Sequence, residues 1–479
     1  MASWLISSLL TAASLAWLVF PTDASPSPAH LQSSMTFRDN SSTAPVVRVL
    51  NGSYAGIHSA EFNQDFFLGM PYAQKTPRFT VSQPLNSSWE GVRNATAYPK
   101  HCIGYGGDNV GYEVSEDCLY LNVVRPAGIS QTAGLPVAVW IHGGGLFMGG
   151  SADKRYNLSF IVQKSVELGT HMIGVSLNYR LSAFGFPCGR EAAEAGVTNL
   201  GFKDQRLALR WVKENIAAFG GAPDKGSSFR AGFGPDGGGG GGGGGGGIDT
   251  DEEMRKAIAS IVGADVERTA GKTADQVVDE LAYLYPNIQA VGIPSLDKWP
   301  AIHPGDPVAD NMGAQYRRAA ALFGDFHMQF SRRQASLAFA AQGLPSWSYR
   351  FDVVLPRLPG FVGATHFQEV AFAFGNTRGD GYAENPFAHD TEKRLSALSG
   401  AMSTAWVNFI TGQAPNGPDG MSLAGLPGGE TWPVYDPAVG GGVGQNMVWS
   451  EEGSYVEMDS FRAQGINYFI DNSLAVFGL

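Results

Sequence analysis

The sequence predicts an α/β protein in which a central, mostly parallel sheet is flanked by helices, with a small antiparallel part at the N-terminal end. The apolar runs 137–141 and 171–177 have the length of buried strands. Residues 202–219 follow with apolar side chains at spacings of three and four, as in an amphipathic helix that covers a sheet. This alternation of strand and helix is typical of parallel sheets.

The other elements are predicted from the same patterns. Short β-rich runs bounded by turns indicate further strands at 46–50, 66–69, 118–124 and 347–351. Helical spacing indicates helices at 251–262, 274–284 and 391–410. Asp249 and Asp251 are candidate caps for the first of these helices, and Asp390 for the last, because an aspartate carboxylate can accept hydrogen bonds from free N–H groups at a helix start.

The strand 135–141 leads into the most informative stretch, His142-Gly143-Gly144-Gly145. A strand that breaks into three glycines lets backbone N–H groups point at one spot without side chains in the way. Such donors stabilise a developing oxyanion, and removing one costs about 10²–10³ in rate. An ordinary glycine turn at the end of a strand is the alternative interpretation.

Composition limits the classes of partner. The chain has 479 residues, enough to bury a large core, and a net charge of −11. This acidic balance, without any cluster of Lys and Arg, argues against a nucleic-acid partner.

The N-terminus and the sequons predict a secreted protein. An apolar run at 5–20, followed by small residues and prolines, favours a cleaved signal peptide over 1–25, with an uncleaved anchor as the alternative. Five Asn-X-Ser/Thr tripeptides are candidate glycosylation sites, at Asn40, Asn51, Asn86, Asn94 and Asn157.

The three cysteines fit an oxidising compartment. Cys102 and Cys118 close a short loop and could pair there, which would stabilise the fold by about 3 kcal/mol. Cys188 is then left over, and we expect it to be a buried structural thiol.

Several long motifs occur in one order along the chain. They are Phe-Leu-Gly-Met-Pro-Tyr-Ala at 67–73, Glu-Asp-Cys-Leu-Tyr-Leu-Asn-Val at 116–123, the glycine turn, Asn-Tyr-Arg at 178–180 and Asn-Ile-Ala-Ala-Phe-Gly-Gly at 215–221. With these motifs the chain resembles the type-B carboxylesterase/lipase family of α/β-hydrolases, which includes cholinesterases and secreted fungal lipases. The resemblance covers almost everything outside 226–247 and implies one domain over 26–479.

The resemblance assigns roles to particular residues. It makes Gly144 and Gly145 the oxyanion donors, Cys102–Cys118 the N-terminal disulfide, and Arg78 with Glu116 a structural ion pair. The segment 363–369 resembles the loop that bears the catalytic histidine, so His366 is the expected general base. The chain has nine histidines, and a random one is more often structural. Glu369 is interpreted as part of the supporting loop rather than as the triad acid.

The nucleophile of the family is missing. A Gly-X-Ser-X-Gly elbow is expected soon after 223–225, but the chain reads Arg-Ala-Gly-Phe-Gly at 230–234, so Gly232 occupies the serine position. The segment with the triad acid is missing as well, and eleven glycines at 237–247 stand there instead. We expect a disordered tract over 226–247, which leaves the core incomplete, because ordering glycine costs about 1–2 kcal/mol per residue.

The family chemistry is acyl transfer to serine followed by hydrolysis of a small-molecule or lipid ester, without metal or cofactor. Loss of the serine costs about 10⁶ in turnover, so this chain is expected to be nearly inert. Three explanations stay open: a coding segment lost in reading the gene, a binding or adhesion protein of the same fold, and a decaying gene. The sequence does not decide the oligomeric state or contact with a lipid surface.

Overall fold

The computed structural model describes residues 44–230, 247–356, 358–417 and 431–478. The chain divides into two compact units. We call residues 24–233 and 369–431 the N-terminal unit, and residues 234–368 and 432–479, with 1–23, the C-terminal unit. The predicted signal peptide, Asn40, Gly232 and most of the glycine tract lie outside the described residues.

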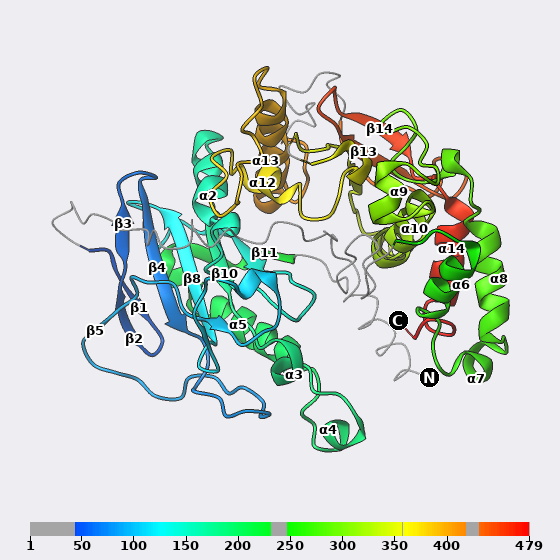
Figure 1. Ribbon diagram of the computed structural model, residues 1–479. Coiled ribbons are helices and arrows are strands. Elements are labelled where there is room, and N and C mark those ends of the chain that lie inside the picture. Colours follow the sequence, from blue (N-terminus) through cyan, green and yellow to red (C-terminus); the bar gives the residue numbers. More distant parts are fainter. Residues whose placement is uncertain (1–43, 231–246, 357, 418–430, 479) are drawn as a thin grey trace. The chain divides into compact units, whose positions relative to one another are not determined.

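A six-stranded sheet forms the centre of the N-terminal unit, in the order β11-β9-β10-β8-β4-β3 (Figure 1). The β11–β9 and β9–β10 pairs are parallel, whereas β10–β8, β8–β4 and β4–β3 are antiparallel. The antiparallel part of this sheet is therefore larger than the sequence predicts. The strands are β3 (Ile57–Ser59), β4 (Gln64–Pro71), β8 (Tyr120–Pro126), β9 (Leu135–Ile141), β10 (Ile173–Leu177) and β11 (Gly221–Arg230).

The predicted disorder is wrong for residues 226–230. Their backbone belongs to β11 and lies in parallel register with β9, from Gly226 opposite Val137 to Arg230 opposite Ile141. The prediction weighed the entropy of the glycine tract but not the hydrogen bonds that the central strand β9 offers to its neighbour. Such ladder bonds satisfy backbone groups that would otherwise be buried without partners.

Helices cover both faces of this sheet. On β10 a Cβ added at Gly174 would contact Leu158 and Val162 of α2 (Leu158–Glu167), so this face of the sheet lies against α2. The adjacent Val175 points to the opposite face and belongs to the core that contains the side chains of α5 (Leu200–Asn215). The predicted helix at 202–219 thus begins two residues earlier and ends in a 3₁₀ turn at Ile216–Phe219.

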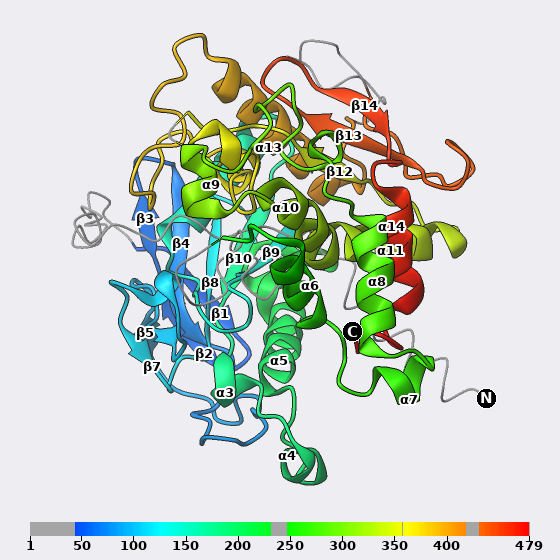
Figure 2. The ribbon, with the colours of Figure 1, turned by 45° about the vertical axis from the view of Figure 1, so that its right-hand side comes forward.

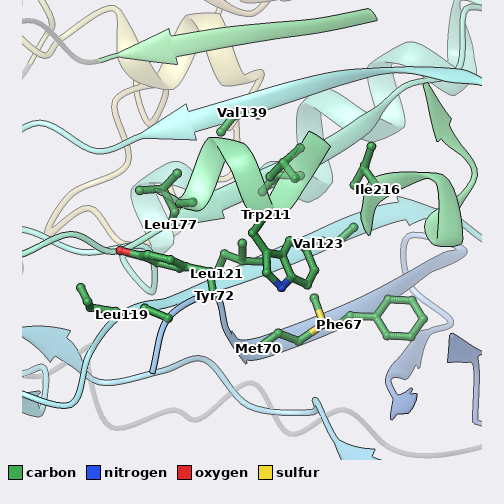
Figure 3. Packing of buried hydrophobic residues seen from close by; sticks show 14 of the residues in the cluster. Phe67, Met70, Tyr72, Leu119, Leu121, Val123, Val139, Leu177, Trp211 and Ile216 are labelled. Carbon is green, nitrogen blue, oxygen red and sulfur yellow. The ribbon is translucent and has the colours of Figure 1, made fainter. Parts of the chain in front are cut away.

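The core beneath α5 is dense and apolar (Figure 3). Trp211 of α5 lies among Phe67 and Met70 of β4 and Val123 of β8, and each of them is buried. Burying one large apolar side chain contributes about 1.5–3 kcal/mol. This packing holds the central strands, and with them the end of β9, in place.

Smaller elements complete the N-terminal unit. A three-stranded sheet has the order β1-β2-β5 and a two-stranded sheet pairs β6 with β7. Lys393 is the N-cap residue of α13, but Asp390 accepts hydrogen bonds from the N–H groups of Leu395 and Ser396 in the first turn, as a capping carboxylate does. The elements are β1 (Val46–Val49), β2 (Gly52–Ala55), β5 (Val92–Asn94), β6 (His101–Cys102), β7 (Val114–Ser115), α3 (Ser182–Gly185), α4 (Arg190–Glu194), α12 (Val370–Phe374) and α13 (Arg394–Gly412).

The C-terminal unit consists of helices and a three-stranded sheet with the order β12-β13-β14 (Figure 2). Its apolar core is shared by α6, α8, α10 and α14. The helices are α6 (Asp251–Ala259), α7 (Val266–Ala270), α8 (Ala274–Leu284), α9 (Pro307–Met312), α10 (Tyr316–Gly324), α11 (Phe330–Ala341) and α14 (Ala463–Asn472). The strands are β12 (Tyr349–Phe351), β13 (Gln445–Trp449) and β14 (Tyr455–Met458).

Capping of α6 differs from the prediction. Thr250, rather than Asp249 or Asp251, caps the helix and forms a capping box with Glu253. Asp249 accepts a hydrogen bond from the N–H of Ala314, and Asp251 forms an ion pair with Arg318. Both carboxylates therefore tie α6 to the segment around α10 instead of closing the helix end. In the described part of the chain, no helix has the length and apolarity needed to cross a membrane.

Candidate active site

The glycine turn follows directly from the central strand β9. The backbone φ angles are +100° at Gly144 and +58° at Gly145, a region that favours glycine. The carbonyl of Gly144 accepts hydrogen bonds from the N–H groups of Phe147 and Met148. A Cβ at Gly144 would lie 2.2 Å from the Met148 carbonyl oxygen, so only glycine fits this tight turn.

The N–H groups of Gly144 and Gly145 are available to a ligand. Within the described residues, neither of them donates a hydrogen bond to the protein. Both residues are partly exposed at the end of β9. Two unoccupied backbone donors on a rigid, side-chain-free turn are what stabilisation of an oxyanion requires.

His142, the residue before the three glycines, supports the turn. Its buried imidazole stacks on Tyr179 with ring centroids 4.6 Å apart, and the Tyr179 hydroxyl donates to the His142 carbonyl at 2.9 Å. Burial lowers the pKa of His142 to about 4, so the ring is neutral at neutral pH. The His142 Nδ1 lies 2.9 Å from the Gly143 carbonyl oxygen and, when it carries the proton, donates to it. His142 is therefore a structural support of the turn.

A network of buried amides holds the chain that follows the turn. Asn178 accepts from the N–H of Ser151 at 2.8 Å and donates to the Lys100 carbonyl at 2.8 Å. Asn122 of β8 donates to the hydroxyls of Ser151 and Ser176 at 3.0 Å each. The role of Asn122 was not predicted, although a polar residue inside an apolar strand is a usable signal because a buried amide needs partners.

A second histidine that the sequence analysis missed lies under the same region. His101 is buried and stacks on Tyr112 with centroids 4.2 Å apart. A Cβ at Gly150 would lie 2.2 Å from its ring, so the chain after the turn packs directly on this imidazole. Burial lowers the pKa of His101 to about 3, which keeps the ring neutral. Its position beside Cys102 is the only sequence signal.

The structure contains a disulfide between Cys102 and Cys118, next to His101. Arg78 and Glu116 form the expected ion pair, in which the Arg78 Nε donates to Glu116 at 2.8 Å. The side chains of this pair are 55% and 39% exposed. Exposed pairs contribute little to stability, so we expect the Arg78–Glu116 pair to order the disulfide loop locally rather than to stabilise the whole fold.

Replacing both Cys102 and Cys118 by Ser is expected to lower the free energy of unfolding by about 3 kcal/mol, because the unfolded chain without the cross-link gains the entropy of the open loop. Urea unfolding monitored by circular dichroism measures the change. The single replacement Cys188→Ser is the control and should be neutral. Equal stability of the double variant and the parent would contradict the prediction.

Cys188 is exposed, so the expectation of a buried thiol is wrong. It lies between the short helices α3 and α4, where the neighbouring Gly189 and Arg190 are exposed as well.

His366 belongs to the C-terminal unit, in the loop 363–368. The loop is held by a hydrogen bond from the Gln368 amide to the Thr365 hydroxyl at 2.6 Å. Phe367 has a φ of +72°, a strained conformation for a bulky residue and one that clusters at functional sites. Burial lowers the pKa of His366 well below its ordinary value, so the imidazole is neutral, as a general base must be. Its pairing with the glycine turn stays a prediction.

Glu369 is buried, and burial raises its pKa well above the ordinary value. A raised pKa disfavours the carboxylate, which is the form that would stabilise the imidazolium during acyl transfer. This agrees with a supporting role for Glu369. The position of the predicted nucleophile, Gly232, lies outside the described residues.

One candidate glycosylation site is wrong. Asn157 is 5% exposed, and its side-chain oxygen accepts from the N–H of Ser159 and so caps α2. A sequon pattern carries no information about burial, so the sequence could not exclude this site. Asn86 and Asn94 are exposed and Asn51 is half-buried. In the residues that the structure describes, no group of three His, Cys, Asp or Glu side chains could hold a metal ion.

Comparison with known proteins gives one consistent family. The model of the carboxylesterase family matches residues 43–226 and 301–441, more than half of the chain. Lipase 1 of Geotrichum candidum is 38% identical over 207 residues, which are 37% of this chain and 36% of the lipase. Carboxylesterase 1C of Mus musculus is 38% identical over 250 residues, 48% of this chain and 42% of that protein.

A third relative is an inactive carboxylesterase-like protein of Byssochlamys spectabilis, which is 40% identical over 167 residues, 33% of this chain and 29% of that protein. The matched segments span less than half the length of each of these three relatives. The family match and the sheet with helices on both faces lead to the same conclusion: the chain belongs to the carboxylesterase family and has an α/β-hydrolase fold.

Proposed function

We propose that the protein is a secreted carboxylic-ester hydrolase by descent, and that the chain with this sequence keeps the oxyanion half of the site without its nucleophile. The observation that carries the proposal is the pair of unoccupied N–H donors at Gly144 and Gly145, on a turn that only glycine can form. Such a turn is suited to an ester carbonyl whose oxygen gains negative charge.

The roles of the remaining groups follow from this chemistry. The two glycine N–H groups would stabilise the tetrahedral oxyanion, and the neutral imidazole of His366 would take a proton from the attacking group and return it to the leaving alcohol. Gly232 has no hydroxyl to attack with. Loss of the serine costs about 10⁶ in turnover and leaves about 10³–10⁴ over water from the oxyanion hole and binding.

Hydrolysis of p-nitrophenyl butyrate by the purified full chain tests the proposal. We expect a rate about 10⁶ below that of an intact serine esterase, which leaves at most about 10³–10⁴ over the uncatalysed reaction. A variant with His366→Ala should be equally slow. Turnover that His366→Ala abolishes would refute the expected inactivity. If there is no turnover, sequencing the transcript across codons 225–250 shows whether a coding segment was lost.

A second candidate function is a secreted binding protein without catalysis. Gly232 at the nucleophile position and the similarity to an inactive carboxylesterase-like protein favour it. Export is tested separately by expressing the full chain in a fungal host and looking for it in the medium. If the transcript encodes the sequence as written and the exported chain does not hydrolyse esters, the binding function is preferred to the hydrolase.

A further inference from the structure

Arg317 lies near the start of α10 in the C-terminal unit (Figure 2) and is only 1% exposed. Its Nε and Nη2 donate to the Gln289 carbonyl at 3.2 Å and 3.0 Å, and its Nη1 donates to the Trp299 carbonyl at 3.2 Å. Burial lowers the pKa of this guanidinium, and the negative charge of Asp297 opposes that shift. A charged donor binds carbonyls more strongly than a neutral one, so the guanidinium is a strong link between two points of the chain.

The two carbonyls belong to residues 289–302, which we call the support loop. The Gln289 side chain closes this loop, because its Nε2 donates to the Ile302 carbonyl at 2.9 Å and its Oε1 accepts from the Ile302 N–H at 3.1 Å. The N–H of Ile293 donates to the backbone carbonyl of Arg317 at 3.1 Å. Arg317 therefore holds the support loop on α10 through its side chain and its backbone.

Aromatic rings connect the support loop to the turn that precedes His366. Phe361 lies in a short 3₁₀ turn. Its ring makes edge-to-face contacts with Trp299 and Tyr316, at centroid distances of 5.8 Å and 6.1 Å. Edge-to-face pairs define the orientation of the rings as well as their distance. Trp299 belongs to the support loop and Tyr316 to α10, so Phe361 contacts both elements that the arginine joins.

Two glycines of the segment before His366 also lie directly on the support loop. A Cβ at Gly360 would be 2.7 Å from the Trp299 ring. A Cβ at Gly363 would be 3.2 Å from Pro294, and the φ of Gly363 is +71°. The backbone that leads to His366 is thus in close contact with the support loop, so the position of the imidazole depends on where this loop is held.

We propose that Arg317 is a positioning residue for the general base: by holding the support loop on α10, it fixes the turn before His366 and with it the place and burial of the imidazole. The proposal rests on the base role of His366 stated under the proposed function. Arg317 touches no reacting atom and acts through Trp299 and Pro294. Without the guanidinium, the carbonyls of Gln289 and Trp299 lose this donor, which favours a loop that opens to water.

Deuterium exchange of the histidine rings tests the proposal on the full chain. The Cε1 hydrogen of an imidazole exchanges in heavy water at a rate that depends on its pKa and on solvent access, and peptide mass spectrometry reads each histidine separately. In the parent, His366 should exchange more slowly than the exposed His389, because its Nδ1 is shielded from solvent. The pH midpoint of its exchange should lie below the ordinary value, because burial lowers the pKa of His366.

In Arg317→Met we expect exchange at His366 to be about tenfold faster, because hydrogen bonds from a charged donor are lost. Its pH midpoint should move up toward the ordinary histidine pKa of about 6.5 as the imidazole becomes solvated. The buried His142 of the N-terminal unit is the internal reference and should exchange as in the parent.

Arg318→Met is the matched control. Arg318 is the next residue of α10 and is also buried, but it donates to carbonyls at the C-terminal end of α8 instead of the support loop. Its replacement should leave exchange at His366 as in the parent. If Arg317→Met does not fold, Trp299 provides the second test: Trp299→Phe, which keeps an aromatic ring beside Phe361, should keep the parent rate, and Trp299→Ala should raise it.

Unchanged exchange at His366 in a folded Arg317→Met overturns this proposal and leaves the proposed function untouched. Equal acceleration in Arg317→Met and Arg318→Met also overturns it, because a general loss of stability then explains the change. Exchange at His366 of the parent as fast as at His389 overturns the general-base role and this proposal with it.

Discussion

Replacing Asp459 by Ala is expected to lower the free energy of unfolding by about 3–5 kcal/mol, because it leaves two buried arginines without their counter-charge. Asp459 is fully buried after β14. It accepts hydrogen bonds from Arg332 and Arg333 of α11 at 2.8–3.0 Å. It also accepts from the Asn446 amide and the Tyr435 hydroxyl, each at 2.9 Å.

The loss should depend on pH in a defined direction. Burial by itself raises the pKa of Asp459, but Arg332 and Arg333 overcome it and hold the pKa well below its ordinary value. Because the folded pKa lies below the unfolded value of about 3.9, the contribution is fully present above that pH and declines as the pH falls below it. The stability difference between Asp459→Ala and the parent should therefore shrink between pH 5 and pH 3.

Thermal and urea unfolding at pH 7, 5 and 3 measure both effects. Asp471→Ala, at an exposed position in α14, is the matched control and should change stability by less than about 0.5 kcal/mol. A parent-like stability of Asp459→Ala at pH 7 would show that the cluster is not needed for the C-terminal unit. A loss that grows toward pH 3 would contradict the sign of the pKa shift.

Replacing Gly144 by Ala is expected to cost about 2–6 kcal/mol, the combined size of backbone strain and overpacking. The added Cβ would lie 2.2 Å from the Met148 carbonyl oxygen, and the φ of +100° at Gly144 is itself unfavourable for alanine. The turn would have to open, which moves the N–H groups of Gly144 and Gly145. Equilibrium unfolding in urea measures the cost.

Gly169→Ala is the control for the strain alone. Its φ is +70°, and nothing lies within 4 Å of the Cβ that the substitution adds. We expect a loss of about 1–2 kcal/mol there, from the left-handed backbone only. If Gly144→Ala costs no more than Gly169→Ala, the Met148 carbonyl does not constrain the turn, and the rigid oxyanion hole that we infer is wrong.

Elements with a strong local signal were predicted well. The helix 274–284 has the predicted bounds, and α5 and α13 differ from the prediction only at their ends. Apolar spacing and caps are local properties, so one sequence contains them. Sheet pairing was predicted less well: β8 pairs antiparallel with both β10 and β4, although the strand–helix alternation predicted a mostly parallel sheet.

In the candidate site, too, local features could be predicted and contacts between distant segments could not. The three glycines could be recognised because strand and turn are contiguous in the chain. The sequence could not show the roles of Asn122, His101 and Asn157. Their hydrogen-bond partners lie up to 54 residues away, or their roles depend on burial. For Asn94 the sequence contains the sequon, but only strand register places it opposite Ala55 of β2.

By itself, the sequence determined the order of strands and helices, the glycine turn after β9, the family motifs and the glycine at position 232. These depend on neighbouring residues, whose chemistry and spacing act over a few positions of the chain. The tertiary structure decided which N–H groups stay without a protein partner, which histidines are neutral, and which asparagines face water. Those properties follow from burial and from contacts between distant segments, which arise only when the chain packs.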